Sequence, residues 1–419
     1  MLPKVNHAGR STIAVVKTVG PLVILLFLIW YAGRTGFAAL LYTYATKTNQ
    51  LAAADAAVRL SPDDANAHHI RGAIFEANGD YSMANADYVR AVSLRPDDYI
   101  FWLSLARIRE LNGEMSSAII AAREAVQLAN YYSQPHWQLG NLLVRSGDQD
   151  TGFAELRLAT ASNPVLLPGV VDLAWQLSGG STERVKQIIE PNTPAAYIAL
   201  ADCFMKRNKV TEAVEMIRAA GDDAKDRRRQ FLNELVSTKR FPDAYSLWLL
   251  FQPAGTRGQP ITNPGFEQQT DLDEPGFGWQ AKKNQTVLLS LDQINPAEGK
   301  FSLEVEFKGD SEAGLPVMTQ LVLVEPGAHY QLNFAARTKE VVSGGLPSLT
   351  ITDAVSGSPL GDSGAFPKTT DGWRQYTVDF TVPKATSTIQ IVLQRHGCSG
   401  SPCPIFGYLW LDSFSLRRL

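Results

Sequence analysis

The chain has 419 residues, of which 45% are apolar and 19% are charged, and its formal net charge is −3. This length exceeds what one hydrophobic core usually serves, so we expect two or three domains. The composition is that of a folded protein and excludes wholesale disorder. The negative net charge argues against a nucleic-acid-binding protein.

The first fifty residues contain a candidate membrane anchor. All their charged residues are basic, and the first carboxylate of the chain is Asp55. From Ile13 to Tyr31, nineteen residues carry a single charge, that of Lys17, whose long side chain can reach the lipid headgroups. A helix of this length covers about 28 Å, close to the bilayer core of about 30 Å. The sequence therefore predicts a transmembrane signal anchor over residues 12–33.

The residues that flank this segment predict its orientation. Lys4 and Arg10 precede the span, so the positive-inside rule makes residues 1–11 cytoplasmic and the bulk of the chain periplasmic or otherwise exoplasmic. Trp30, at the far end, suits an interfacial aromatic belt. We therefore expect a single-pass protein of a bacterial-type inner membrane. The alternatives are a cleaved signal peptide and a buried core helix, and Pro21 would kink the span.

Residues 36–252 carry an internal repeat. Ala57, Ala91 and Ala125 follow one another at a constant interval. One complete unit has signature residues at His68, Gly72, Phe75, Ala84, Tyr88, Ala91 and Pro96. The interval and these residue types resemble the tetratricopeptide repeat, which implies an α-solenoid of antiparallel helix pairs that meet through small residues.

Two parts of this region depart from the regular repeat. Residues 36–61 hold a partial repeat continuous with the anchor, and a degenerate stretch contains Gly179 and Gly180. The resemblance implies a concave groove, lined by the first helix of each repeat, that binds an extended peptide or a partner helix. The groove candidates by repeat position are Asn66, His69, Glu76, Arg107, Glu110, Trp137 and Asn141. For each of them the alternative is a solvated helix face.

The composition changes at residues 253–260, where turn formers replace the alanine-rich helices, and we predict a linker there. Beyond it, apolar residues alternate with period two, as from Phe301 to Phe307, which indicates half-buried strands. About eight such segments predict an antiparallel β-sandwich or jelly roll over residues 261–419. The expected fold class is multi-domain α + β: one transmembrane helix, a tetratricopeptide-type α-solenoid and an antiparallel β-sandwich.

Short motifs in this region resemble the jelly-roll carbohydrate-binding modules found beside xylanases and glucanases. In chain order they include Asn263-Pro-Gly-Phe-Glu267, Phe277-Gly-Trp279, Gly299-Lys-Phe-Ser-Leu303, Phe334-Ala-Ala-Arg337, Trp373-x-x-Tyr376 and Leu411-Asp412-Ser-Phe-Ser-Leu416. The resemblance implies a structural calcium held by Glu267 and Asp412 in an oxygen-only site. Pro264 and Ser413 depart from the family pattern, and the alternative is that both carboxylates are capping or solvated groups.

Three aromatic residues are candidates for contact with a glycan, namely Trp410, Tyr408 and Trp279. The segment from Tyr408 to Leu411 is apolar on both parities, so another element or a ligand must cover one of its faces. Trp279 matches a position that is usually part of the core.

Two of the three cysteines are candidates for a disulfide. Cys398 and Cys403 lie in a tight loop, and in an oxidising compartment a disulfide is the natural prediction. A zinc site would need two more ligands, and only His396 is near. Cys203 lies within a repeat helix, where we expect a buried small hydrophobe.

The sequence contains no phosphate loop, no Gly-x-Ser-x-Gly elbow and no His-Glu-x-x-His motif. We therefore expect a protein that is not an enzyme; the enzymatic alternative is a polysaccharide lyase or hydrolase built on the sandwich. The favoured hypothesis is an envelope scaffold that binds a protein partner through its repeats and a glycan through its sandwich, in envelope or extracellular polysaccharide assembly or export. The alternative is a purely protein-binding component of an envelope complex.

Overall fold

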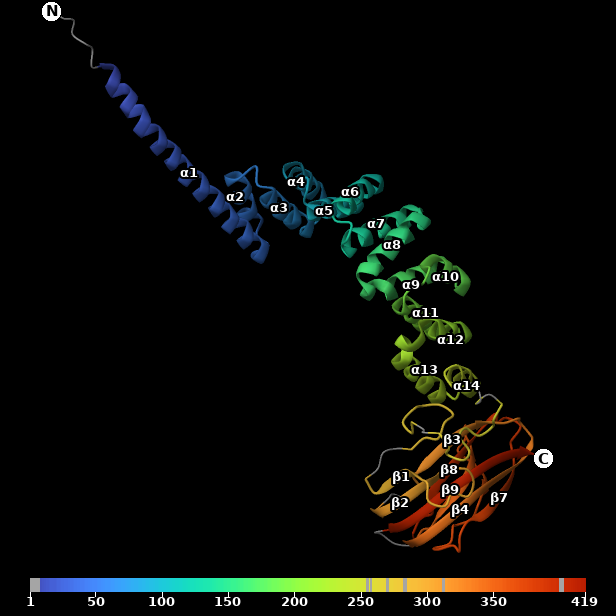
Figure 1. The fold of residues 1–419 in the computed structure, drawn as a ribbon. Coiled ribbons are helices and arrows are strands. Elements are labelled where there is room, and N and C mark those ends of the chain that lie inside the picture. Colours follow the sequence, from blue (N-terminus) through green and yellow to red (C-terminus); the bar gives the residue numbers. More distant parts are fainter. Residues whose placement is uncertain are drawn as a thin grey trace, which may run out of the picture. The chain divides into compact units, whose positions relative to one another are not determined.

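The computed structural model describes residues 8–253, 256, 258–268, 271–281, 285–310, 313–398 and 403–419. Its contacts divide the chain into two compact units, Met1–Ala199 and Leu200–Leu419. Figure 1 shows helices throughout the first unit, and helices followed by strands in the second. A helical-repeat region followed by an antiparallel sheet domain is the order that the sequence predicts.

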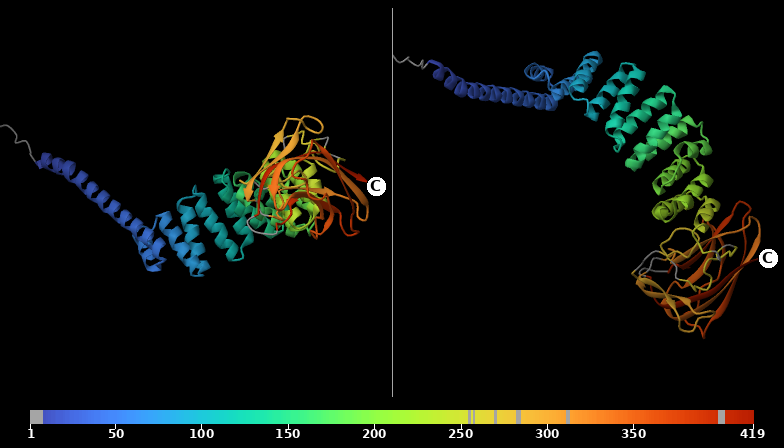
Figure 2. Two further views of the ribbon diagram at one scale, coloured as in Figure 1. Left: turned by 90° about the horizontal axis from the view of Figure 1, so that it is seen from below. Right: turned by 45° about the horizontal axis from the view of Figure 1, so that its top comes forward.

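The first unit consists of helices. They are α1 (Ala8–Thr48), α2 (Leu51–Leu60), α3 (Ala65–Ala77), α4 (Tyr81–Leu94), α5 (Tyr99–Leu111), α6 (Met115–Leu128), α7 (Ser133–Ser146), α8 (Gln149–Ser162), η1 (Pro164–Leu166), α9 (Leu167–Leu177) and α10 (Thr182–Ile189). α11 (Pro194–Lys206) crosses the boundary between the units. Figure 2 shows successive helices of the first unit stacked side by side.

Small residues and helix caps explain why these helices pair. An added Cβ at Gly140 would lie 2.7 Å from the Leu156 side chain, so only glycine allows α7 and α8 to approach this closely. Asp64 caps α3 by accepting a hydrogen bond from the Asn66 amide, and Asp98, one repeat later, caps α5 in the same way. The repeat period therefore fixes both where a helix starts and where two helices touch.

α1 is longer than the predicted anchor. It continues without a break past Pro21 and ends at Thr48. Its last turns pack on α2 and α3, with Ala38 and Ala45 fully buried, so this end of the helix forms the partial repeat with α2. The segment Pro21–Thr48 is long and apolar enough to cross a membrane, with a mean hydropathy of 1.7.

In the part of the chain that the structure describes, the second unit contains three complete helices and nine strands. The helical elements are α12 (Val210–Ala220), η2 (Gly221–Ala224), α13 (Lys225–Ser237) and α14 (Phe241–Leu249). The strands are β1 (Val287–Asp292), β2 (Ser302–Asp310), β3 (Met318–Leu323), β4 (His329–Ser343), β5 (Pro347–Asp353), β6 (Pro359–Asp362), β7 (Arg374–Thr381), β8 (Thr388–Arg395) and β9 (Pro404–Arg418). The prediction omitted β6, which has four residues and no apolar alternation.

The strands form two sheets, with orders β1-β2-β9-β4-β7 and β3-β8-β5-β6, in which all neighbouring strands are antiparallel. One continuous apolar core contains residues of both sheets, among them Phe334 and Leu409 of the five-stranded sheet and Ile351 and Ile391 of the four-stranded sheet. Apolar alternation therefore predicted the core residues of β2, β7 and β8, such as Val305, Phe380 and Ile391.

The last helix is joined to the segment that precedes β1. The Trp248 ring of α14 lies 5.9 Å from the Phe277 ring, and Tyr245 meets the same ring edge-on at 4.9 Å. Gly276 has a φ of +128°, and a Cβ there would lie 2.3 Å from Trp248. Arg228 of α13 also forms an ion pair with Glu274 at 2.9 Å. The compact unit that contains the sheets thus also contains these helices. Of the predicted linker, residues 253–260, positions 254, 255 and 257 lie outside the described residues.

Candidate binding surfaces of the repeats and the sheet

One repeat position ties each helix pair to the turn before it. The His68 Nε2 atom lies 3.0 Å from the carbonyl oxygen of Pro62, and the Trp102 indole donates to the Pro96 carbonyl at 2.8 Å. The third member, His136, makes the same contact one repeat after Trp102, with the carbonyl of Asn130. Each of these three side chains therefore fixes the start of its helix pair to the preceding turn.

A buried charge cluster lies behind His68. Its Nδ1 atom is 2.8 Å from Asp87, which also accepts two hydrogen bonds from Arg71, and Arg71 reaches Asp55. Burial alone would raise the pKa of Asp87, but the hydrogen bonds from Arg71 and His68 outweigh burial and hold that pKa below its usual range. The cluster stabilises the first complete repeat.

The predicted groove residues of α3 and α5 touch one another. Glu76 accepts a hydrogen bond from the Tyr88 hydroxyl at 2.8 Å and forms an ion pair with Arg107 on the next first helix. Glu110, which occupies the same repeat position as Glu76, forms an ion pair with Arg145 of α7. The structure thus places predicted groove residues along consecutive first helices, with opposite charges alternating.

The remaining groove candidates take part in local contacts. His69 lies 2.9 Å from the Ser104 hydroxyl, and burial lowers its pKa. Asn66 accepts a hydrogen bond from Arg95 at 3.4 Å. The Asn141 amide donates to the carbonyl of Trp137 at 2.7 Å, a contact within α7. His68 and His69, which are adjacent along α3, contact different partners.

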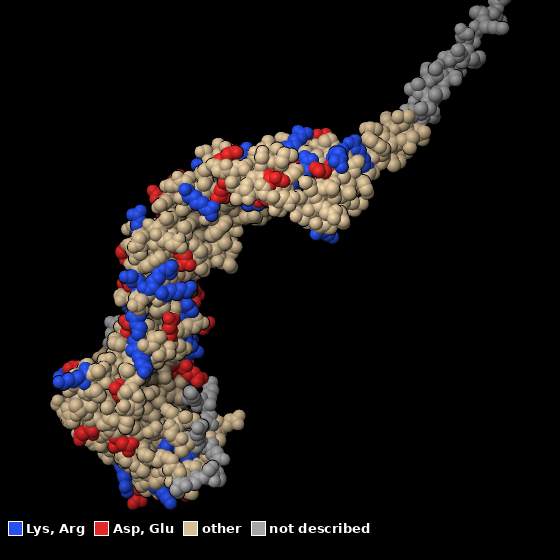
Figure 3. Space-filling model, turned by 180° about the vertical axis from the view of Figure 1, so that it is seen from behind, with Lys and Arg blue, Asp and Glu red and all other residues tan. Residues whose placement is uncertain are grey.

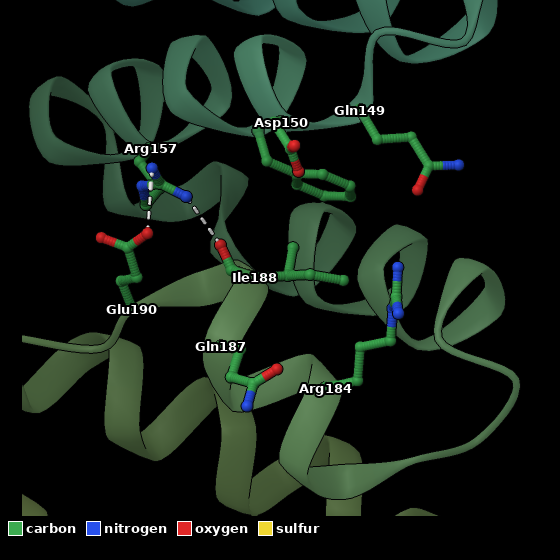
Figure 4. A pocket seen from close by; sticks show the side chains of 8 residues that line it. Gln149, Asp150, Arg157, Arg184, Gln187, Ile188 and Glu190 are labelled. Carbon is green, nitrogen blue, oxygen red and sulfur yellow. Dashed lines mark hydrogen bonds and ion pairs between the residues drawn. The ribbon is translucent and has the colours of Figure 1, made fainter.

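The first unit also contains a cavity that the sequence did not predict. It has a volume of about 350 Å³ and is lined by Gln149, Asp150, Phe153, Arg157, Arg184, Gln187, Ile188 and Glu190 of and around α8 and α10 (Figure 4). Arg157 is used within the protein, since it donates to the Ile188 carbonyl at 2.8 Å and pairs with Glu190 at 3.2 Å. The sequence did not reveal the cavity, because the lining residues on and after α10 follow the degenerate stretch and could not be aligned with a repeat position.

The outward face of the five-stranded sheet carries the predicted glycan candidates Tyr408 and Trp410. Both lie on β9 with their rings 5.7 Å apart, and each donates a hydrogen bond to a carboxylate of β2, Tyr408 to Glu306 at 3.2 Å and Trp410 to Glu304 at 3.0 Å. Phe406, two residues before Tyr408, is 49% exposed and extends this row. Phe406 is not among the predicted glycan candidates, although the sequence places it on the same strand face as Tyr408.

The side chain of Arg337 covers one end of this face. The Arg337 guanidinium lies 4.2 Å from the centre of the Trp410 ring and 5.3 Å from that of Trp373. Trp410 is consequently only 7% exposed, so Tyr408 and Phe406 offer more ring surface to a ligand. We define the outer aromatic row as Phe406, Tyr408 and Trp410.

The structure corrects the third glycan candidate. Trp279 is 1% exposed and packs against Phe266 and Phe414, while its indole donates to the carbonyl of Asn263 at 3.2 Å. Such a ring has no face free for a sugar. Trp279 belongs to the core of the sheet domain.

The two carboxylates of the predicted calcium site hold one loop. Glu267 accepts hydrogen bonds from the amides of Lys300 and Phe301, and Asp412 accepts them from Ala297 and Glu298. Burial raises the pKa of Asp412, and the nearby charge of Glu267 raises it further. Within the described residues no group of three or more His, Cys, Asp or Glu side chains surrounds one point. Calcium takes six to eight oxygens, so loop carbonyls and water would have to complete the coordination.

The predicted disulfide between Cys398 and Cys403 is present. The buried guanidinium of Arg395 donates to the Cys403 carbonyl at 2.7 Å and to the Ser343 hydroxyl at 3.1 Å, which ties the loop to the end of β4. Cys203 is a buried free cysteine.

Comparison with known proteins supports the repeat assignment. Residues 75–133 match the tetratricopeptide repeat family. Among solved structures, the crystal structure of MamA is 16% identical and covers 38% of this chain and 89% of its own, with a TM-score of 0.32. YrrB, a TPR protein with an unusual peptide-binding site, is 18% identical and covers 45% and 84%, with a TM-score of 0.30. MamA residues 41 to the end from Desulfovibrio magneticus RS-1 are also 18% identical, covering 32% and 76%, with a TM-score of 0.29. No curated protein matches the chain.

Proposed function

We propose that this protein is a membrane-anchored scaffold that binds a protein partner through the first helices of its repeats. Tetratricopeptide-repeat proteins mediate protein–protein interactions, and the family is typically non-enzymatic. The observation that carries the proposal is the row of polar and charged side chains on α3, α5 and α7, in which Glu76 and Glu110 occupy equivalent positions and pair with the next first helix. Such a row offers a peptide regularly spaced donors and acceptors.

The proposed location is a bacterial-type inner membrane, with the N-terminus in the cytoplasm and the repeats and sheets in the periplasm. The apolar length of α1 and the basic residues before it support this orientation. The disulfide between Cys398 and Cys403 also favours an oxidising compartment. In Figure 3 the described part of α1 next to the grey atoms carries no charged side chains, whereas both signs are interspersed over the helices beyond it.

Site-specific photo-crosslinking of the full chain in cells tests the scaffold. A photoreactive residue at Trp137 or Asn141, on the predicted groove, should give one discrete protein adduct. The matched control position is Ile120, an exposed residue of the second helix α6, which should give none. An adduct at Ile120 that is absent from Trp137 and Asn141 would place the partner elsewhere and overturn the groove assignment.

A second function, glycan binding by the outer aromatic row, has its own supporting observation. Aromatic rings stack on sugar rings, and carboxylates beside them accept hydrogen bonds from sugar hydroxyls; Phe406, Tyr408, Glu304 and Glu306 bring both groups to one face. On this proposal the scaffold acts in envelope or extracellular polysaccharide assembly or export.

Binding of the full chain to a panel of polysaccharides tests this second function. Retention on one polysaccharide class, lost in Tyr408→Ala and in Phe406→Ala but kept in Val355→Ala, next to β5 of the other sheet, is the expected result. If a folded chain binds no polysaccharide while the groove still captures its partner, the protein is a purely protein-binding component of an envelope complex.

A further inference from the structure

We propose that the outer aromatic row binds an acidic polysaccharide, and that Arg337 holds the carboxylate of one of its hexuronate residues. The inference rests on the proposed glycan function and names the class of glycan that this face takes. It starts from a cation on β4 whose hydrogen-bonding capacity is unused in the described part of the chain.

Arg337 is largely buried but donates no hydrogen bond to another described residue. Its side chain is 19% exposed, and its Nε atom is buried without a partner. The carboxylate of Asp292 lies 3.8 Å away, which is too far for a hydrogen bond. Arg71 and Arg228, whose side chains are 21% and 13% exposed, both donate hydrogen bonds to carboxylates. The environment of Arg337 therefore lacks an acceptor that comparable arginines of this chain have.

The position of Asp292 is fixed by its own turn. One of its oxygens accepts a hydrogen bond from the Ile294 amide at 2.7 Å, which ties the carboxylate to the end of β1. The ion pair with Arg337 is consequently long, and the donors of the guanidinium stay available to a second carboxylate.

The aromatic neighbours of Arg337 orient its guanidinium. Trp410 and Trp373 lie 4.2 and 5.3 Å from it, and the Trp373 indole is fixed by donating to the carbonyl of Asn295 at 2.9 Å. A guanidinium that stacks on aromatic rings keeps its N–H edge for acceptors in its own plane. A planar carboxylate matches this edge, because it can accept two parallel hydrogen bonds.

The strand on one side of the outer aromatic row supplies carboxylates. Glu304 of β2 accepts a hydrogen bond from the Trp410 indole, and Glu306 accepts one from the Tyr408 hydroxyl. Glu306 also pairs with Lys308 at 3.0 Å. These carboxylates would repel an anionic group that lay over β2, so the carboxylates of a bound glycan have to point toward the strand on the other side.

The strand on that other side, β4, supplies cations. In the register of β4 with β9, Arg337 is opposite Trp410. Lys339 is opposite Tyr408, and its exposed side chain has no ion pair or hydrogen bond with another described residue. Directly opposite residues of antiparallel strands share one sheet face, so both cations lie beside the outer aromatic row.

A hexuronate polymer matches this arrangement. Its sugar rings can stack on Phe406 and Tyr408, while its hydroxyls donate to the carboxylates of β2. Carboxylates that recur along the polymer reach Lys339 and, at the Trp410 end, Arg337. A sulfated glycan carries the same sign of charge, and the experiment has to separate it from a uronate.

Binding of the detergent-solubilised full chain to immobilised polysaccharides tests the inference. The probes are polygalacturonate, alginate and hyaluronate, each beside its carboxyl-reduced derivative, in which a neutral hydroxymethyl group replaces the carboxylate. Dextran sulfate is the control for charge alone. We expect the chain to retain a uronate polymer, to bind its carboxyl-reduced form about tenfold less tightly, and to bind dextran sulfate more weakly than the uronate.

Substitutions of the two cations test the same contact from the side of the protein. Arg337→Lys keeps the charge but loses the planar fork, so it should weaken binding of the uronate polymer about tenfold. Arg417→Lys, the same change at an exposed arginine of β9, should leave binding unchanged. Lys339→Gln should weaken binding several-fold, whereas Lys384→Gln, at an exposed lysine between β7 and β8, should not.

The outcomes separate this inference from the glycan function on which it rests. Equal binding of a uronate polymer and its carboxyl-reduced form, or of a uronate polymer and dextran sulfate, would overturn the inference in the wild-type chain, whether or not Arg337→Lys folds. Binding that is lost in Tyr408→Ala but kept in a folded Arg337→Lys would leave the glycan function and remove the carboxylate contact. If a folded chain retains no polysaccharide of either kind, both proposals are wrong.

Discussion

The helical repeats and the sheet domain differ in how often each contact is represented in the sequence. In the repeats, a position such as that of Ala84 and Ala118 recurs once in every repeat, and each neighbour lies within one or two helices. In the sheets, Leu303 pairs with Leu411, and this contact occurs once. A local contact that recurs in every repeat can be recognised in a single sequence. A contact between distant strands occurs once, and the only sign of it in the sequence is the apolar alternation within each strand. The two regions should therefore also respond differently to substitution.

The largest expected effect is at the joint between the last helix and the sheet domain. Trp248→Ala removes a buried ring that packs on Phe277 and should cost about 3–5 kcal/mol of unfolding free energy. Since α13, α14 and the sheets share one compact unit, they should lose stability together, in one transition. Chemical denaturation of the full chain, followed by tryptophan fluorescence and circular dichroism, measures this. Tyr131→Ala, at an exposed position, is the control and should change little; loss of α14 alone, with the sheets unchanged, would contradict the shared unit.

A smaller, local effect is expected in the first complete repeat. Asp87→Asn removes the buried carboxylate that pairs with Arg71 and His68 and should destabilise the first unit by about 3 kcal/mol, because the partly buried Arg71 guanidinium loses its charged partner Asp87 and keeps only Asp55. Asp63→Asn, which breaks the exposed pair with Arg90, should cost at most about 0.5 kcal/mol.

Acid should reduce the difference in unfolding free energy between the two variants. The folded pKa of Asp87 lies below its unfolded value of about 3.9, so its contribution is present above that value and is lost as the pH falls through the folded pKa. Urea titrations of the wild type and both variants at pH 7 and pH 3 measure how much unfolding free energy each substitution removes. If the loss caused by Asp87→Asn were larger at pH 3, or if Asp87→Asn also shifted the unfolding transition of the sheets, the cluster would not act through local repeat stability.

The two regions also differ in what the sequence could predict about their sites. Repeat position predicted Glu76, Arg107 and Glu110 on consecutive first helices, but not their pairing, because the sequence does not show which rotamer reaches the next helix. Alternation predicted the core residues of β2, β7 and β8, but it could not show that Arg337 of β4 covers Trp410 of β9, which depends on a register with two shifts. The contact of Gly276 with Trp248 had no local signal at all.

A bound calcium ion would add another difference between the two regions, because it would join distant segments of the sheet domain at one point. We propose a calcium ion at Glu267 and Asp412, and saturation at 100 times its Kd should stabilise the domain by about 2.7 kcal/mol. The raised pKa of Asp412 means that its charge costs stability as the pH rises through that pKa, so calcium should stabilise the domain more above that pKa than below it. Calorimetry of the full chain with calcium and with chelator measures this, and Glu267→Gln should abolish the shift. If calcium does not raise the unfolding temperature of the wild type at pH 7, both carboxylates serve only as hydrogen-bond acceptors for the loop amides.

The smallest effect is expected at the groove. Glu110 and Arg145 are partly exposed, so a double-mutant cycle with Glu110→Gln and Arg145→Gln should give a coupling of about 0.5 kcal/mol or less by thermal unfolding. The charges nevertheless face the proposed partner, so Glu110→Arg should weaken partner capture at the Trp137 crosslinking position while the melting temperature stays within a few degrees. Asp63→Arg, an exposed charge reversal in the turn before α3 at a residue that pairs with Arg90 of the second helix α4, is the control. If Glu110→Arg unfolds the first unit, the pair is structural, and the groove, like the Asp87 cluster, would belong to the fold and not to a site.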